Sequence, residues 1–359
     1  MSKILYSAGT LTHIENFHLP YIEALREDGH KVTVMASGEG ADINMPFVKK
    51  ILSPKNLLLS LRVRRLIRRE KFDVLILNTT LASFVVRLAL GKKRRPRVIN
   101  FVHGYMFKEN PTGIKDRIFL LAEGLMRHKT DDILVMNSED YRIAKRYKLC
   151  IGEVKMTRGM GARVREKSRI PPEKIRKLLN SESEFVLCYV GELCELKNQK
   201  MLIRALPIIK EQIPESALWL IGEGRAKAEL RELAQELGIA DSVVFLGKRK
   251  DPCDYIRASD LYVSASKKEG LPFNILEALG CGKTVIATDV KGQRDIIEDG
   301  ISGILYPSES VTELVRLVCA VYNGEIQIDS ANALERYAKF CFDTVFEKTY
   351  GVMRELIEK

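Results

Sequence analysis

Short apolar runs alternate along this chain with longer segments whose apolar positions recur every three or four residues. The runs predict buried strands, and the longer segments predict amphipathic helices. Alternation of this kind is typical of parallel sheets covered by helices on both faces. The predicted strands are Ile4–Ser7, Val32–Ala36, Val74–Leu77, Val98–Val102, Ile133–Met136, Phe185–Val190, Ala217–Ile221, Val243–Leu246, Leu261–Val263 and Thr284–Ala287. The predicted helices include Phe17–Glu27, Leu57–Arg69, Ile118–His128, Gln199–Lys210, Ala226–Leu237 and Phe273–Gly280.

The alternation pauses once, over residues 152–172, where glycines and basic residues precede two consecutive prolines. This composition indicates a linker whose proline opens the next helix. The fold class is therefore α/β, with two doubly wound Rossmann-like domains at 1–168 and 169–338. We expect the final helix, 339–359, to pack back on the first domain. In such sheets ligands bind beyond the carboxyl ends of the strands, and two facing domains would form a central cleft.

Composition fits a globular protein of about two domains, since 359 residues include 46% hydrophobic and 29% charged side chains. No apolar run approaches the ~20 residues that span a bilayer. The first residues do not form a signal peptide, because no basic flank precedes a long apolar stretch. Seven cysteines, an odd number without C-x-x-C spacing, indicate neither a disulfide framework nor a zinc site. A cytoplasmic location is the expectation.

Charge is unevenly distributed along the sequence. Residues 1–170 hold 33 Lys and Arg against 17 Asp and Glu, whereas the remainder holds 25 against 30. Basic side chains gather at Leu57–Arg69, with Arg62, Arg65 and Arg69 on one helical face, and at Gly91–Arg97. These clusters fit either an ordinary solvated surface or attachment to the anionic inner leaflet of a membrane. Nucleic acid is an unlikely partner, because no aromatic residues are interleaved and no binding motif is recognised.

The most informative segment follows the predicted strand Leu261–Val263. Glu269 and Glu277 stand with seven residues between them, and Pro272 suits the first position of a helix that Gly282 would end. The amides at such a helix start favour a phosphate. Carboxylates accept hydrogen bonds from sugar hydroxyls, so the pattern fits a nucleotide sugar. Either glutamate alone is more often an ordinary surface residue.

In the context SxxEGLPFNILEALGCGKTVIATDV, this segment resembles the E-x7-E motif of the retaining family-4 glycosyltransferases, which have the GT-B fold. The resemblance extends to Gly292–Gly300 and, upstream, to Tyr189–Gln199. Stretches 13–25, 101–107 and 135–147 are similar to a subgroup that assembles bacterial capsular polysaccharide or exopolysaccharide. The resemblance makes the first domain the acceptor domain and the second the nucleotide-sugar domain.

The resemblance also implies roles for individual residues. Glu269 would bind the donor sugar, Glu277 the ribose, and Lys197 the leaving diphosphate, while His103 would lie near donor sugar and acceptor. The implied catalytic residues are His103, Lys197 and Glu269. The implied donor-binding residues are Gly191, Lys197, Gly247, Lys248, Arg249, Gly270, Leu271, Pro272, Phe273, Asn274 and Glu277. No metal and no cofactor are expected, because the UDP-sugar is a substrate.

Two departures from the family pattern bear on this expectation. Glu192 follows Gly191 where the family commonly places Arg or Lys, so Lys197 becomes the main cation for the diphosphate. Residues 158–163 read RGMGAR where Asn-Gly-x-Gly-x-Asp is usual, which would alter an inter-domain contact.

The resemblance implies metal-independent, retaining transfer of a hexose or N-acetylhexosamine from a UDP-sugar to a glycan acceptor. The acceptor would be lipid-diphosphate-linked, and the enzyme would lie on the inner face of the plasma membrane. A UDP-sugar epimerase or hydrolase of the same fold stays open as the alternative. A nicotinamide dehydrogenase is disfavoured, because no strand-to-helix turn carries G-x-G-x-x-G.

Overall fold

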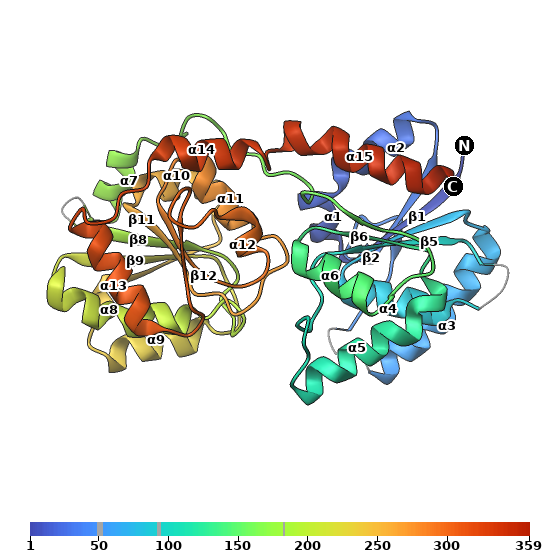
Figure 1. Cartoon of the computed structure of the whole chain (residues 1–359), viewed down its shortest axis with the longest axis horizontal. Helices are drawn as coiled ribbons and strands as arrows, with labels where there is room; N and C mark the ends of the chain where they lie inside the picture. Colours follow the sequence, from blue (N-terminus) through green and yellow to red (C-terminus); the bar gives the residue numbers. More distant parts are fainter. Residues whose placement is uncertain (49–52, 92–94, 182–183) are drawn as a thin grey trace. The chain divides into compact units, whose positions relative to one another are not determined.

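A computed structural model describes residues 1–48, 53–91, 95–181 and 184–359, and it divides the chain into two compact units. Unit 1 comprises Met1–Met160 and Val345–Lys359, and unit 2 comprises Gly161–Thr344 (Figure 1). The chain thus leaves unit 1 after Met160 and returns to it after Thr344. The boundaries predicted from the sequence were 168 and 338. Lys92, Lys93 and Arg94 of the second predicted basic cluster lie outside the described residues.

Unit 1 is built on a seven-stranded parallel sheet with the order β3-β2-β1-β4-β5-β6-β7. Its strands are β1 (Lys3–Thr10), β2 (Lys31–Ser37), β3 (Ile43–Asn44), β4 (Val74–Asn78), β5 (Arg97–Val102), β6 (Asp132–Val135) and β7 (Val154–Met156). Residues of β1, β4, β5 and β6 are almost all buried, which explains why these strands are continuous apolar runs in the sequence. The two short strands β3 and β7 were not predicted.

The helices of unit 1 lie on both faces of this sheet. They are α1 (Leu11–Phe17), α2 (Leu19–Glu27), α3 (Pro54–Glu70), α4 (Thr80–Ala89), α5 (Ile114–Met126), α6 (Ser138–Arg146) and α15 (Phe342–Glu358). Figure 1 shows α3, α4 and α5 on one side of the sheet and α1, α2 and α15 on the other. Right-handed crossovers between parallel strands produce this arrangement.

The predicted helix Phe17–Glu27 corresponds to α2, which begins two residues later at Leu19, and a separate helix, α1, precedes it and meets it at His18. Pro20 occupies the first turn of α2 and has no N–H to donate to the carbonyl of Asn16, so the first helix ends there. The break places the His18 side chain in the interior, where it is fully buried. The break therefore creates a buried imidazole that a continuous amphipathic helix would not have predicted.

Unit 2 contains a six-stranded parallel sheet with the order β10-β9-β8-β11-β12-β13. The strands are β8 (Phe185–Val190), β9 (Ser216–Ile221), β10 (Val243–Gly247), β11 (Leu261–Ser264), β12 (Val285–Thr288) and β13 (Ile304–Tyr306). The helices are α7 (Pro172–Leu178), α8 (Gln199–Gln212), α9 (Lys227–Glu236), α10 (Pro252–Ala258), α11 (Phe273–Gly280), α12 (Gln293–Ile296), α13 (Val311–Tyr322) and α14 (Ser330–Ala338). The main core cluster lies between the sheet and α8, α9 and α13.

The predicted α/β class with two Rossmann-like sheets is confirmed, because both sheets are parallel and helices connect successive strands. Among the described residues, no helix is both long and apolar enough to cross a membrane.

Candidate functional site

Three strand ends of unit 2 lie so close together that side chains would not fit between them. The amide of Gly191, after β8, donates to the carbonyl of Ile221 over 2.9 Å, and the amide of Gly222 donates to Gly247 over 2.9 Å. A Cβ on Gly222 would stand 2.0 Å from the carbonyl oxygen of Gly191. The carboxyl edge of the sheet is therefore a surface of exposed backbone, which a ligand can approach closely.

Helix α11 begins beside this edge and has the predicted bounds, Phe273–Gly280. Pro272 is the N-cap of α11 rather than its first helical residue, and its carbonyl accepts from Leu276. The side-chain amide of Asn274 donates to the carbonyl of Val190 over 2.7 Å, which ties the helix start to the end of β8. First-turn amides lack carbonyl partners within their own helix, so this end of α11 favours an anion.

Lys197 and Glu269, which were predicted as separate ligands of diphosphate and sugar, form an ion pair with each other. Lys197 Nζ lies 2.5 Å from Glu269 Oε1, and the side chains are 23% and 8% exposed. The pair joins the loop after β8 to the loop after β11. These loops also share a hydrogen bond from the amide of Lys267 to the carbonyl of Leu196. The site thus holds a cation and a carboxylate that neutralise each other.

The turn before α12 supports the loop that carries Glu269. Gly292 has φ +79°, and a Cβ there would lie 2.4 Å from the carbonyl oxygen of Gly270. Any other residue at 292 would displace the Glu269 loop, so this glycine positions the site. Leu271, on the same loop, is 6% exposed and packs inward.

Glu277 differs from Glu269 in the contacts of its carboxylate. Within the described part of the chain its carboxylate has no hydrogen-bond or ion-pair partner, and burial raises its pKa to about 7. The side chain is partly exposed, so this carboxylate of α11 can receive hydrogen bonds from a ligand. The hydroxyls of a ribose have that chemistry.

The remaining predicted contacts are exposed. Gly247 has φ +70° and ends β10, and Lys248 and Arg249 follow it on the surface. The Arg249 guanidinium stands 5.3 Å from the ring centre of Tyr255, a cation–π contact that orients it. Glu192 is exposed, and across the described residues its carboxylate forms no ion pair.

A hollow that the sequence did not predict lies beyond Lys197, between the starts of α8 and α9. Its volume is about 720 Å³, and basic side chains of Lys200, Arg204, Arg225 and Lys267 line it. Lys200 and Lys267 pair with Glu229 and Glu309 over 2.7 and 3.1 Å. None of the predicted donor-binding residues lines this hollow, so it is separate from the site built on Glu269 and Glu277.

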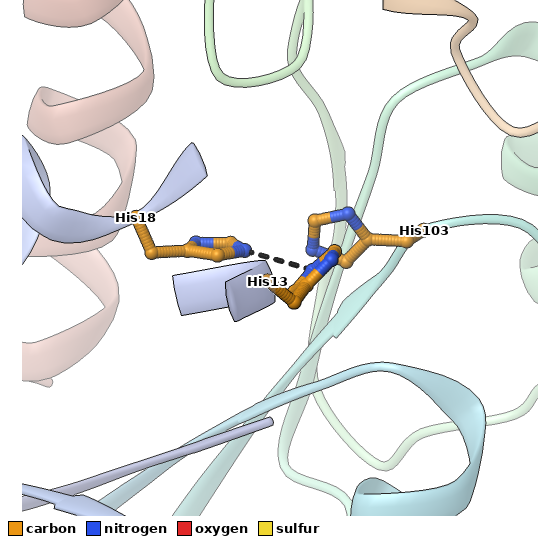
Figure 2. Close-up of side chains that lie close together, drawn as sticks. All are labelled: His13, His18 and His103. Carbon is orange, nitrogen blue, oxygen red and sulfur yellow. Dashed lines mark hydrogen bonds between the residues drawn. The ribbon is translucent and has the colours of Figure 1, made fainter. Parts of the chain in front are cut away.

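In unit 1, His103 follows β5 and belongs to a cluster of three histidines with His13 and His18 (Figure 2). The three rings converge with centroid separations of 4.7 to 5.1 Å. Burial lowers the pKa of His13 to about 4, and it lowers the pKa values of His18 and His103 well below the usual range. All three imidazoles are neutral at pH 7.

Sequence reasoning singled out His103 but missed His13 and His18. Both stood in the stretch 13–25, whose only signal was its resemblance to the capsular subgroup. His18 reaches the cluster because of the helix break before Pro20, and His13 because α1 starts at the end of β1. The cluster contains three of the five histidines in the chain, so an excess of histidine in unit 1 is the signal that the sequence carries.

Comparisons with known proteins agree with this arrangement. Residues 171–340 match the family described as glycosyl transferases group 1, and residues 16–150 match glycosyltransferase family 4. The chain is 30% identical to the Bacillus subtilis glycosyltransferase EpsD over 89% of this chain and 87% of EpsD. It is 23% identical to the Escherichia coli UDP-Gal:alpha-D-GlcNAc-diphosphoundecaprenol alpha-1,3-galactosyltransferase, over 73% of this chain and 69% of that enzyme.

Solved structures share the fold. HepE from Anabaena, in complex with UDP-glucose, superposes with a TM-score of 0.77 at 20% identity, over 99% of this chain and 100% of HepE. WaaG, a glycosyltransferase involved in lipopolysaccharide biosynthesis, superposes with a TM-score of 0.74 at 16% identity, over 97% of this chain and 99% of WaaG. The chain is therefore a glycosyltransferase of family 4 with the GT-B fold.

Proposed function

We propose that this glycosyltransferase takes a hexose or N-acetylhexosamine from a UDP-sugar, with the donor bound at the carboxyl edge of the unit 2 sheet. The observation that carries the proposal is the partnerless carboxylate of Glu277 beside the Lys197–Glu269 pair. A nucleotide sugar presents ribose hydroxyls, a diphosphate and sugar hydroxyls in that order. Those groups match Glu277, Lys197 and Glu269, and HepE, which shares the fold, is a protein solved with UDP-glucose.

Transfer requires that the departing UDP, with about two negative charges, be stabilised. Lys197 and the start of α11 supply a fixed cation and aligned dipoles for this, so the proposed chemistry is metal-independent. When the UDP-sugar binds, the Lys197 ammonium donates hydrogen bonds to both Glu269 and the diphosphate, because it has three N–H groups. The proposed reaction retains the anomeric configuration by a front-side path, in which the leaving oxygen accepts the acceptor's proton. His103, neutral at pH 7, would contact donor sugar and acceptor.

We propose that the acceptor is a lipid-diphosphate-linked glycan in cell-surface polysaccharide assembly. The name of the Escherichia coli relative states such an acceptor for that enzyme, and another relative, LpsE of Rhizobium meliloti, is named for lipopolysaccharide core biosynthesis. A lipid-linked acceptor places the enzyme on the inner face of the plasma membrane. The surface of unit 1 supports this placement.

Helix α5 buries a charged side chain and exposes several large apolar ones. It buries Glu123, which forms a bidentate ion pair with Arg87 at 2.9 Å, and the two side chains are 6% and 0% exposed. Phe119 and Leu120 pack against the core, but four further apolar side chains point outward: Ile114, Ile118, Leu121 and Leu125 are 50% to 79% exposed. These four recur at helical spacing, so they form one apolar stripe. Such a stripe is stable against lipid.

Helix α3, on the same side of the sheet, adds positive charge (Figure 1). Leu57, Leu58 and Leu61 are 47% to 67% exposed, and Arg62, Arg64, Arg65, Arg68 and Arg69 are exposed around and beyond them. An apolar surface edged by arginines matches the interface of an anionic bilayer. We call the exposed apolar residues of α3 and α5, with these arginines, the membrane-facing surface.

The proposal is tested first by a thermal-shift screen against UDP-, GDP- and ADP-sugars and the free nucleotides. UDP and at least one UDP-sugar should raise the melting temperature, whereas GDP- and ADP-sugars should not. The stabilising donor is then incubated with and without a lipid-diphosphate-linked sugar. Transfer that depends on the acceptor supports the proposal. Epimerised or free sugar formed equally well without acceptor would establish the alternative, an epimerase or hydrolase.

A further inference from the structure

The histidine cluster of unit 1 has the spacing of ligands around one metal ion. His13 Nε2 lies 3.2 Å from His18 Nε2, and one ring nitrogen from each of His13, His18 and His103 lies within 4.8 Å of the others. Two nitrogens bound tetrahedrally at 2.0–2.1 Å are separated by about 3.3 Å. The His13–His18 separation therefore already equals the edge of a tetrahedral zinc site. Figure 2 shows the His103 ring beside the His13 ring, with their centroids 4.7 Å apart.

One of the three rings is also oriented by a hydrogen bond on its far side. Tyr6 Oη lies 2.8 Å from His18 Nδ1 inside the core. When this nitrogen donates to the tyrosine oxygen, the lone pair of Nε2 points at His13. A hydrogen bond on the far nitrogen is the usual way in which a protein fixes a metal-binding histidine.

His103 is the ligand that has to move. Its Nε2 lies 3.4 Å from Asn78 Oδ1, which is too long for a strong hydrogen bond. The ring can therefore turn inward at little cost. An approach for the ion exists, because His13 and His103 are partly exposed whereas His18 is completely buried.

We propose that His13, His18 and His103 form a binding site for one divalent transition-metal ion of the zinc class. Three imidazoles fill three positions of a tetrahedron and leave the fourth for water or a ligand oxygen, as in sites of the open type. Imidazole suits zinc, cobalt, nickel and copper and discriminates against magnesium and calcium. The proposal goes beyond the proposed function but shares His103 with it, and its test, metal binding by the full chain, is read separately from sugar transfer.

The test uses the full chain, purified without a polyhistidine tag and stripped with a chelator. Co²⁺ is titrated and the visible absorption recorded, because tetrahedral Co²⁺ absorbs far more strongly than the hydrated ion. One equivalent of Co²⁺ should bind with this spectrum, and Zn²⁺ should bleach it. Zn²⁺ should also raise the melting temperature of the wild-type protein, whereas Mg²⁺ should not.

Matched variants separate this site from adventitious binding. His13→Ala and His103→Ala each remove one partly exposed ligand, so both should lose the Co²⁺ spectrum. Each variant is melted without metal, to check that it is folded. His128→Ala removes an exposed histidine outside the cluster and should bind as the wild type does. A wild type that retains no equivalent of Co²⁺, or cluster variants that bind as much as the wild type, would overturn the proposal in favour of three hydrogen-bonded neutral imidazoles.

Discussion

The two glutamates of the proposed donor site, Glu269 and Glu277, differ in the contacts of their carboxylates. Glu269 has a cation 2.5 Å away, whereas Glu277 has no partner among the described residues and a raised pKa. Ligand binding therefore disturbs an existing ion pair at one residue and satisfies a lone carboxylate at the other. The consequences for affinity and for pH dependence differ in direction.

We expect Glu277→Gln to change the pH dependence of stability. The native carboxyl keeps its proton up to about pH 7, while the unfolded chain releases it near its ordinary pKa of about 4.3. The native state binds more protons between these values, so wild-type stability falls as pH rises from about 5 to 7. The variant has no such slope and should be more stable above pH 7, by about 1–3 kcal/mol. Urea unfolding at several pH values measures this, and parallel profiles would contradict it.

The same variant should show the opposite effect on donor binding. Ribose hydroxyls donate to an ionised carboxylate, so wild-type affinity for a UDP-sugar should increase as pH rises through 7. Glu277→Gln should weaken binding roughly tenfold, the cost of about one charged hydrogen bond, and should lose the pH dependence. UDP-glucose is a suitable probe, because its diphosphate is a diester without a titration near pH 7. Calorimetry that gives equal affinity for both proteins would remove Glu277 from the site.

Substitutions in the Lys197–Glu269 pair should act in opposite directions on UDP. Glu269→Ala releases Lys197 from its partner, so UDP should bind at least as tightly, while transfer is nearly abolished because the donor sugar loses its carboxylate. Lys197→Ala should weaken UDP binding by roughly 10- to 100-fold, corresponding to about 1.5–3 kcal/mol for a charged hydrogen bond. Titration calorimetry and a transfer assay on both variants measure the two effects. Normal turnover in Glu269→Ala would exclude its proposed role.

At the scale of elements, α5 is apolar on both its inner and its outer face and buries one ion pair on the inner face. The Arg87–Glu123 pair fixes which face of α5 turns inward, because breaking it would leave a charge buried without a partner. The apolar stripe lies on the opposite, exposed face. In the proposed membrane attachment, arginines of α3 would contribute a salt-sensitive attraction, and leucines and isoleucines of α3 and α5 a salt-insensitive insertion.

We expect the double substitution Leu121→Gln, Leu125→Gln to reduce binding to anionic phospholipid vesicles at least tenfold, since each leucine contributes about 1.5–3 kcal/mol when fully buried. The loss should persist at high salt. Arg62→Gln with Arg65→Gln should instead weaken binding mainly at low salt, by about 1 kcal/mol per residue. Leu178→Gln is the matched control, because that leucine in unit 2 is 68% exposed. Vesicle sedimentation measures all three, and equal losses in α5 and control variants would exclude α5 as the contact.

Much of this element structure could be predicted from the sequence, for a physical reason. Strands covered by helices on both faces must be apolar throughout, so β1, β4, β8 and β9 are apparent as uninterrupted runs. The edge strand β3 has two residues, and β7 and β13 have three each, too few to form a pattern. The sequence identified Lys197 and Glu269 through motifs. Their ion pair joins residues 72 positions apart, and no local spacing reveals such a contact.

At the scale of the whole molecule, the chain ends by returning to the unit in which it began. Helix α15 packs on unit 1, where Tyr350 Oη donates to Asp28 Oδ2 over 2.8 Å and Thr349 Oγ1 donates to the carbonyl of Gly159 over 3.0 Å. Met353 and Leu356 are completely buried. Unit 1 therefore needs the last fifteen residues of the sequence, Val345–Lys359, to complete its core.

This closure predicts that Met353→Ala destabilises unit 1 selectively. Truncating a fully buried methionine costs about 2–5 kcal/mol, through lost transfer energy and the cavity left behind. The chain contains one tryptophan, Trp219, completely buried in β9, so its fluorescence reports on unit 2 alone. In urea, Met353→Ala should lower the midpoint of a circular-dichroism transition and leave the tryptophan transition in place. Leu206→Ala, in the core of unit 2, should move the tryptophan transition instead. An equal shift of both transitions in Met353→Ala would contradict this prediction, because the two units would then unfold as one cooperative body.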